Sequence, residues 1–309
     1  MTSLGEDRRV ADSLPTTWVD RAPRAVRPYL RLARYDRPVG FWLLAAPCWF
    51  GLAAGRIGAG LGWIDLYYAA LFFIGAVAMR GAGCTYNDIV DRDLDASVAR
   101  TADRPLAAGT VGLKSAWAFL MAQCAVGLLV LIQLPLPAIL TALAALALVA
   151  AYPFMKRITW WPQAWLGLTF NWGVPAAGAT ALGTPFAPEI ILLYVSSLFW
   201  TVGYDTIYAC QDKEDDALIG VKSSALALGR HVRLGVTVSY GLAALLAGAA
   251  GVMAGAGLLF ALGFALYAAH LAWQARGFDP DDGSDCLARF KSNRTTGLLL
   301  TAACLLGGL

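Results

Sequence analysis

Charged side chains are scarce in this sequence. Only 15% of its 309 residues are Asp, Glu, Lys or Arg, whereas a typical soluble domain contains about 25%. Hydrophobic residues make up 58% of the chain. So little charge cannot cover the surface of a soluble protein of this length. The composition therefore predicts an integral membrane protein and excludes a soluble enzyme.

Histidines and closely spaced cysteines are also lacking. The two histidines, His231 and His270, belong to no motif, and the six cysteines are scattered singly without a CxxC pair. This pattern excludes a Cys/His metal centre, and the cysteines are expected to be small buried hydrophobic residues. Basic patches interleaved with aromatic residues are missing as well. We therefore expect no nucleic-acid partner.

A recognisable targeting segment is lacking from the start of the sequence. Residues 1–38 are charged and contain proline, without a hydrophobic core followed by a small-residue cleavage site. Acidic residues in this segment, among them Glu6, Asp7, Asp12 and Asp20, also argue against a mitochondrial transit peptide. These features favour a bacterial inner membrane, with a mitochondrial inner membrane as the alternative. We expect residues 1–38 to form a cytoplasmic N-terminal arm and residues 39–309 a single transmembrane domain.

What the chain does contain is a series of long apolar segments. Each has about the length that a helix needs to cross a bilayer. The second begins near an acid, Asp65, and the last is short. The fold class predicted is an all-α integral membrane protein with about nine transmembrane helices, at residues 39–55, 62–83, 115–134, 136–152, 162–184, 186–206, 232–251, 252–273 and 295–309.

Lys and Arg are distributed very unevenly over this topology. With nine spans, 23 of the 24 Lys and Arg residues fall on one side of the membrane, and only Arg56 lies on the other. Basic residues stay on the cytoplasmic side. We therefore expect the N-terminal arm and the loops after spans 2, 4, 6 and 8 to be cytoplasmic. The net charge of +3 reflects this topology.

Two acidic clusters follow apolar segments on this basic side. Four carboxylates lie between Asp88 and Asp95, and the run DKEDD occupies residues 212–216. Asn87, Asp91 and Asp95 are spaced four residues apart, so a continuing helix places them on one face. Asp88 lies three residues before Asp91 and can join the edge of that face.

The second cluster repeats the spacing of the first. Asp212 and Asp216 are four residues apart, and Asp205 lies about two turns earlier. Like charges at this spacing repel one another, and divalent cations relieve that repulsion. Hard oxygen ligands without His or Cys favour Mg²⁺, which commonly bridges carboxylates to substrate phosphates. The sequence thus predicts Mg²⁺ and a diphosphate held between two carboxylate-bearing helices.

Two other interpretations of these acids exist. In the first, the carboxylates only solvate the ends of helices, but two clusters with helical spacing on one side of the membrane argue against it. In the second, the chain is a cation or lipid transporter, because intramembrane acids mark ion pathways. Transporter sites usually lie near the membrane midplane. Here only Asp205 lies deeper than the helix ends.

Three motifs resemble one known family. NDIVDRDLD (residues 87–95) fits the N-D-x-x-D-x-x-x-D motif of the UbiA superfamily of membrane prenyltransferases, and DKEDD fits its D-x-x-x-D motif. YPFMK (residues 152–156) fits a third, Y-x-x-x-K element. The resemblance runs from RLARYDRPVGFWLL (residues 31–44) to the last span. Flanking stretches such as RTADRPLAAG (residues 100–109) are most similar to the group that prenylates 4-hydroxybenzoate.

The resemblance implies a helical bundle around a central cavity, capped by cytoplasmic loops and open sideways to the lipid bilayer. The donor would be an allylic polyprenyl diphosphate. Its headgroup would be held by Mg²⁺ on the motif residues Asn87, Asp91, Asp95, Asp212 and Asp216, with Asp88 beside them. Lys156 would donate to the phosphate with Tyr152 nearby, and Arg104 and Lys222 in the capping loops would add charge or pair with the acids.

For the acceptor, 4-hydroxybenzoate, the resemblance implies attack by its ring on an allyl cation, in the synthesis of ubiquinone. Its carboxylate needs a cation, and Arg80, two turns before Asn87, is the candidate that we favour. A salt bridge from Arg80 to Asp205 or Asp88 is an equally open interpretation. Other candidate substrate-binding residues are Arg157, Asp205, Asn171 and Tyr208. A different acceptor on the same fold, such as naphthoate, homogentisate, a chlorophyll precursor or a lipid-linked sugar, is the main alternative.

Overall fold

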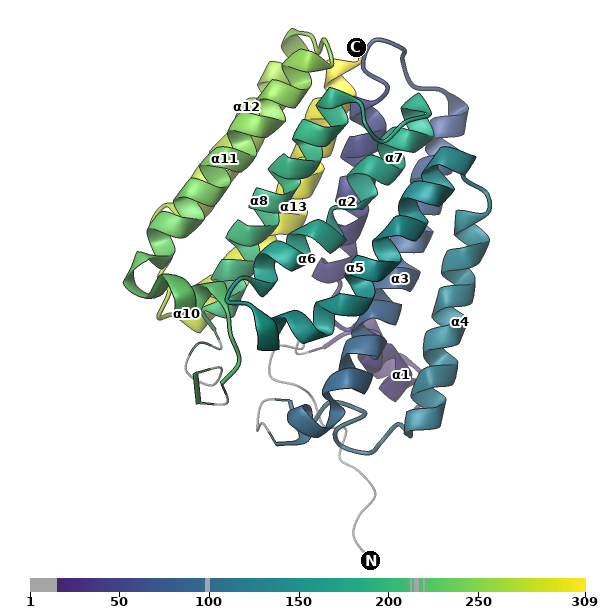
Figure 1. Ribbon diagram of the computed structural model, residues 1–309, viewed down its shortest axis with the longest axis vertical. Coiled ribbons are helices and arrows are strands. Elements are labelled where there is room, and N and C mark those ends of the chain that lie inside the picture. Colours follow the sequence, from purple (N-terminus) through teal and green to yellow (C-terminus); the bar gives the residue numbers. More distant parts are fainter. Residues whose placement is uncertain (1–15, 98–100, 212, 214–216, 219) are drawn as a thin grey trace, which may run out of the picture. The chain divides into compact units, whose positions relative to one another are not determined.

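All regular elements in the described part of the chain are helices, which confirms the all-α expectation (Figure 1). The computed structural model describes residues 16–97, 101–211, 213, 217, 218 and 220–309. The chain forms two compact units. One contains the described residues up to Phe41 together with Ile74–Val130, and the other contains Trp42–Phe73 and Leu131–Leu309.

The smaller unit is built around the second half of the long helix α3 (Trp63–Ala96). It also contains η1 (Trp18–Arg21), α1 (Arg27–Leu32) and almost all of α4 (Leu113–Leu131). A hydrophobic cluster joins α1, the connection after α3 and the start of α4. Its buried members are Leu32, Leu106, Val111 and Ala116, and the partly buried Tyr29, Ile89 and Phe119 pack against them. This core fixes α1 beside the acidic end of α3.

The larger unit contains most of the apolar helices. Within it, α8 packs against α11, α12 packs against α13, and α6 and α7 pack against α5 and α8. The four helices α8, α11, α12 and α13 run side by side (Figure 1). This unit contains α2 (Val39–Ala54) from Trp42 onward and α3 as far as Phe73. Its other elements are α5 (Leu136–Ile158), α6 (Pro162–Phe170), α7 (Gly173–Leu182), α8 (Pro188–Ala209), α10 (Ser224–Leu228), η2 (Gly229–His231), α11 (Val232–Met253), α12 (Leu258–Ala275) and α13 (Gly283–Gly307).

Six helices in the described residues are long and apolar enough to cross a membrane: α3, α4, α5, α8, the stretch Ser224–Met253 that contains α11, and α12. The other three predicted spans also fall on helices. However, α2 has 16 residues, α13 begins with a polar turn, and the span at 162–184 is broken into α6 and α7. Large apolar side chains such as Leu129 on α4 and Leu262 on α12 are exposed, as lipid-facing side chains should be.

The break between α6 and α7 lies at Asn171, which follows the last residue of α6. Its side-chain Nδ2 donates to the carbonyl oxygens of Gly167 at 2.8 Å and Ser197 at 3.0 Å, and to Thr201 Oγ1 at 2.7 Å. Interrupted helices survive in a membrane only where neighbouring groups satisfy the freed backbone. Gly173 then restarts the helix in close contact with α2, since a Cβ there would lie 2.5 Å from Cys48 Sγ.

The acid at the start of the second predicted span has a specific partner. Asp65 is only 3% exposed, and its Oδ1 accepts a 2.8 Å hydrogen bond from Nε of Arg56. Arg56 also donates through Nη1 to the carbonyl oxygen of Ala181, at the end of α7. The single basic residue on the far side of the predicted topology is therefore part of a buried ion pair.

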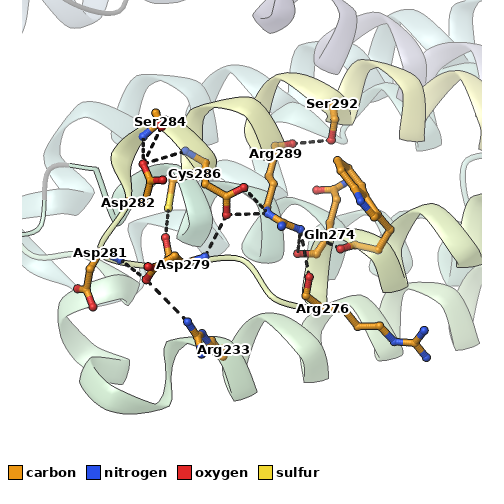
Figure 2. Close-up of polar contacts among 12 residues, drawn as sticks. Arg233, Gln274, Arg276, Asp279, Asp281, Asp282, Ser284, Cys286, Arg289 and Ser292 are labelled. Atoms are coloured by element: carbon orange, nitrogen blue, oxygen red, sulfur yellow. Dashed lines mark hydrogen bonds and ion pairs between the residues drawn. The ribbon is translucent and has the colours of Figure 1, made fainter.

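The connection between α12 and α13 is ordered by polar contacts (Figure 2). Asp282 caps α13 by accepting hydrogen bonds from the backbone nitrogens of Ser284 and Asp285. Arg289 Nε donates to both oxygens of Asp285, and its Nη1 donates to the carbonyl oxygens of Trp273, Gln274 and Arg276. One guanidinium group thus satisfies the end of α12 and ties it to α13.

Candidate active site

The first acidic motif lies on α3, which continues as a helix to Ala96. This confirms the helical geometry that the four-residue spacing of Asn87, Asp91 and Asp95 requires. Asp91 is fully buried and Asp95 is 5% exposed. Asp93, which points off the motif face, is instead 86% exposed and pairs with Arg92. The motif carboxylates are therefore withdrawn from bulk solvent, whereas the intervening acid is solvated.

Arginines surround this motif within the smaller unit. Arg104 Nη1 lies 2.7 Å and 2.9 Å from the two oxygens of Asp95 and 3.5 Å from Oδ1 of Asp88. Arg34 Nη2 donates to the same Asp88 oxygen at 2.7 Å. Arg104 was expected to add charge or to pair with the acids, and the structure has it paired. Arg34 is a residue of this site that the sequence analysis did not identify.

The position of Arg34 could not be read from spacing. It lies 54 residues before Asp88, and in the sequence it is one of eight arginines in a basic arm. The one local signal is the stretch LARYDRP (residues 32–38), where an arginine takes the place that a glycine commonly has after a helix. In the structure Arg34 has φ = 60°, the left-handed conformation.

Arg80 lies on α3 two turns before Asn87, partly buried. Its guanidinium lies against the start of α2, because a Cβ placed on Gly40 would be 2.4 Å from Arg80 Nε and 3.0 Å from Cζ. Glycine at position 40 therefore makes room for this side chain. The proposed contact of Arg80 with an acceptor carboxylate stays a prediction.

The Y-x-x-x-K element lies at the end of α5, where Tyr152, Lys156 and Arg157 belong to the last two turns. The segment after the second acidic motif docks there, since the backbone nitrogen of Lys222 donates to the carbonyl oxygen of Lys156 at 3.0 Å. The structure thus brings Lys156 and Lys222 together. The Lys222 ammonium, which we expected over the acids, donates to the carbonyl oxygen of Ile158 and lies 5.8 Å from the centre of the Trp160 ring.

The second acidic motif follows α8. Asp205 lies on the last turns of this helix, and the ring of Tyr208 packs at 4.5 Å against that of Phe290 on α13. Asp212 and Asp216 lie outside the described residues. Lys213, between them, donates to the carbonyl oxygen of Pro280 and to Asp281. The start of this motif is therefore attached to the α12–α13 connection.

The donor set can be compared with what a metal ion requires. In the described ranges no three His, Cys, Asp or Glu side chains come together as a metal site. That statement does not cover Asn87, which is none of these four residue types. Nor does it cover Asp212 and Asp216, which lie outside the described residues. The first motif offers an amide and two carboxylates on one helix face, all hard oxygen donors, which fits Mg²⁺ rather than a softer metal.

The comparisons with known proteins identify the family. Residues 44–300 match the UbiA prenyltransferase family. The chain belongs to this family. A rat 4-hydroxybenzoate polyprenyltransferase is 46% identical to this UbiA-family chain, covering 94% of it and 77% of the relative. The human enzyme of the same name is 44% identical over 94% and 78% of the two chains, and that of Arabidopsis thaliana is 41% identical over 98% and 75%.

Solved structures show the same fold. The apo structure of a UbiA homolog from Aeropyrum pernix K1 superposes with a TM-score of 0.70 at 26% identity, covering 87% of this UbiA-family chain and 98% of that one. A UbiA homolog from Archaeoglobus fulgidus bound to GPP and Mg²⁺ gives a TM-score of 0.67 at 19% identity, over 91% and 99% of the two chains.

The comparisons correct the predicted localisation. We expected a bacterial inner membrane because residues 1–38 lack a targeting signal. The rat, human and Arabidopsis thaliana relatives are all mitochondrial enzymes. These relatives contradict the expectation of a bacterial inner membrane, which was therefore wrong. The expectation failed because the lack of a recognisable targeting signal does not by itself determine the compartment. The multi-pass membrane character is supported by the six long apolar helices.

Proposed function

We propose that this protein transfers a polyprenyl group from polyprenyl diphosphate to 4-hydroxybenzoate, at the ring carbon ortho to the hydroxyl, with release of diphosphate. The observation that carries the proposal is the 41–46% identity to 4-hydroxybenzoate polyprenyltransferases over more than nine-tenths of the chain. Because the matched residues include all three motifs, the reaction class and the acceptor follow together. The product is a precursor of ubiquinone.

Asn87, Asp91 and Asp95 would hold the metal from one side, and Asp212 and Asp216 from the other. Their oxygen chemistry favours Mg²⁺. When bound, the ion supplies positive charge that stabilises the leaving diphosphate. The protein's own contribution is to keep these carboxylates dry, as the burial of Asp91 and Asp95 supports, because electrostatic interactions are stronger where water is excluded.

Basic residues would hold the phosphate oxygens. Lys156 is a compact positive charge suited to phosphate. Its backbone carbonyl holds the segment that follows the second acidic motif, which supports a place beside the donor headgroup. Tyr152, one turn earlier on α5, would line the same region. Arg157, Arg104 and Lys222 would contribute charge around it.

The chemical step begins when the carbon–oxygen bond of the allylic donor breaks and diphosphate leaves with the electron pair. The resulting cation needs a dry site with aromatic faces. The acceptor ring then forms the carbon–carbon bond ortho to its hydroxyl, and loss of that carbon's proton restores aromaticity. Arg80 would hold the acceptor carboxylate, with Asp205 orienting it. Asn171 and Tyr208 would lie along the cavity.

The topology completes the proposal. A single transmembrane domain of residues 39–309 would contain about nine helices, and the prenyl tail would lie in the bilayer beside them. Residues 1–38 would form the arm that precedes it. In the predicted topology both acidic motifs follow apolar segments on the side that carries 23 of the 24 Lys and Arg residues, so the headgroup chemistry would take place at that membrane surface.

The direct test uses purified protein in liposomes with geranyl diphosphate, 4-hydroxybenzoate and Mg²⁺, and mass spectrometry to detect the prenylated acid. We expect product that disappears with EDTA and in Asp91→Ala. Asp93→Ala is the matched control, because Asp93 is exposed and lies off the motif face. Donor binding without product would redirect the search to another acceptor. No donor binding at all would overturn the prenyltransferase assignment and favour transport.

A further inference from the structure

Asp88, in the first acidic motif, is almost fully buried and is paired with two arginines. Its side chain is 1% exposed, while those of Arg34 and Arg104 are 10% and 17% exposed. A buried carboxylate is costly unless it is paired, and removing one partner of such a pair leaves an uncompensated charge. Its Oδ1 receives both guanidinium groups. Asp88 is thus held by two arginines through one oxygen, while its buried Oδ2 has no hydrogen-bond partner among the described residues.

Arg34 reaches Asp88 from an unfavourable backbone conformation. It is the sole non-glycine residue with positive φ in the described ranges. The turn closes α1, with Arg34 N donating to Arg31 O at 3.0 Å and Tyr35 N donating to Leu30 O at 2.9 Å. Glycine normally occupies this position because it adopts the left-handed conformation without strain. An arginine is strained in this conformation. Its side chain, however, provides the hydrogen bond to Asp88 that a glycine could not make.

The two ends of the Arg34 guanidinium have different partners. Nη1 donates to the carbonyl oxygen of Arg31 at 3.2 Å, within the same turn, and Nη2 donates to Asp88 at 2.7 Å. The first contact fixes the direction of the side chain, and the second connects the end of α1 to α3. A planar guanidinium suits this two-way bridge, whereas the ammonium group of a lysine is a point charge.

Arg104 extends the connection to a predicted metal ligand. Its Nη1 contacts both oxygens of Asp95, and it is only loosely placed on Asp88 at 3.5 Å. The loop that carries it is attached to the same helix end, because Thr101 Oγ1 donates to the Asp95 carbonyl oxygen at 2.9 Å. Arg104 therefore contacts Asp95 closely and Asp88 only at a longer distance. Arg34 supplies the close positive charge that Asp88 would otherwise lack.

We propose that Arg34 is a positioning residue for the metal site and that Asp88 is its anchor. This inference rests on the proposed function. With Arg34 in place, the charge of Asp88 is balanced and Arg104 stays on Asp95, which fixes that carboxylate. Without Arg34, the uncompensated charge of Asp88 draws Arg104 away, and Asp95 loses its orientation. Mutation of a residue that orients a metal ligand typically lowers metal affinity by about 10–100-fold.

The test measures binding of Mn²⁺ alone by electron paramagnetic resonance, with purified protein in detergent. We expect Arg34→Gly to weaken Mn²⁺ binding about tenfold. Glycine relieves the backbone strain at this turn but leaves the buried Asp88 with one arginine fewer, so the melting temperature is measured alongside to confirm that the variant is folded. The Mn²⁺ affinity of Arg34→Lys should lie between those of Arg34→Gly and the wild type. Arg24→Gln, an exposed arginine of the same segment, is the control and should bind as the wild type does.

A second substitution separates positioning from ligation. Adding Asp88→Asn to Arg34→Gly removes the charge that draws Arg104 away, so Mn²⁺ affinity should return toward that of the wild type. If Asp88 were a ligand, the double variant would bind more weakly still. Wild-type affinity in Arg34→Gly would also overturn the inference.

The Mn²⁺ measurement contains no acceptor, so it separates this inference from the proposed function. Mn²⁺ binding that weakens in Arg34→Gly, together with a wild type that makes no prenylated 4-hydroxybenzoate, would leave the positioning role standing and overturn the assigned acceptor. A wild type that prenylates the acid, with unchanged affinity in Arg34→Gly, would do the reverse. A wild type that binds no Mn²⁺ would overturn both.

Discussion

Gln274 and Asn293 exchange hydrogen bonds between α12 and α13, and both side chains are fully buried. Asn293 Nδ2 donates to Gln274 Oε1 at 2.8 Å, and Gln274 Nε2 donates to Asn293 Oδ1 at 3.2 Å. Trp200 on α8 and Tyr240 on α11 each donate to one member of this pair. Four helices of the larger unit therefore meet at one amide pair.

The amide pair leads to a stability prediction. Asn293→Ala should lower the free energy of unfolding by about 1–3 kcal/mol, because it leaves buried groups on Trp200 and Gln274 without that partner. The joint replacement of Gln274 and Asn293 by leucine should cost less than the sum of the single changes, since both polar groups are then removed. Thermal unfolding in detergent measures this. Leu262→Ala, on the exposed face of α12, is the control, and additive costs would contradict the prediction.

The second prediction concerns the acidic motifs. Asp91→Ala and Asp212→Ala should each reduce turnover to below about a tenth of the wild-type rate, because each removes a carboxylate that supports the metal. Product formation by mass spectrometry measures this, with Asp93→Ala as the exposed control. More than a tenth of the activity in either variant would count against a metal site that both motifs share.

The third prediction concerns Arg80 and the acceptor. Arg80→Ala should raise the KM for 4-hydroxybenzoate about tenfold, since hydrogen bonds to charged groups contribute about 1.5–3 kcal/mol. The affinity for the diphosphate donor should not change. An unchanged KM would assign the acceptor carboxylate to another cation.

Gly40→Ala offers a test of the same contact from the opposite side. Its Cβ would meet the Arg80 guanidinium at 2.4 Å, so the side chain has to move and the KM for the acid should rise. Gly83→Ala, on α3, is the matched control, because a Cβ there has no neighbour within 4 Å. If the two alanine variants have the same KM, the position of Arg80 does not matter for acceptor binding.

The fourth prediction is a pH dependence at the α13 cap. Hydrogen bonds from the Ser284 hydroxyl and from the backbone nitrogens of Asp285 and Ser284 lower the pKa of Asp282. A carboxylate with a lowered folded-state pKa stabilises the fold above its unfolded pKa of about 3.9. That contribution is lost as the pH falls through the folded-state value. Asp282→Ala should therefore lower the melting temperature at neutral pH and have progressively less effect below about pH 4. A constant difference across this range would contradict the prediction.

Periodicity predicted much of this structure because it depends on neighbours along the chain. The four-residue spacing of Asn87, Asp91 and Asp95 required a helix, and α3 continues through all three. The break at Asn171 could not be predicted in this way, because an apolar stretch has the same composition whether its helix is continuous or interrupted. What decides is a set of partners on α8 that come into reach only after folding.

The same distinction explains the site. Arg34 was indistinguishable from an anchoring arginine until its distance to Asp88 was known. The family resemblance implied that Lys222, six residues after Asp216, would add charge or pair with the acids. The backbone bond to Lys156 instead directs its side chain toward Ile158. The side of the membrane on which the site lies stays a prediction from charge composition, whereas the individual pairings depended on tertiary contacts.

The interrupted helix has a consequence for how this protein enters its membrane. With 9 and 10 residues, α6 and α7 are each about 14–15 Å long, half of the roughly 30 Å hydrocarbon thickness. Neither half is long enough to be an independent span, and the side-chain amide of Asn171 at the break donates to Ser197 and Thr201 on α8. Synthesis must therefore deliver α8 before α6 and α7 can leave the insertion machinery, and these three helices enter the bilayer as one unit.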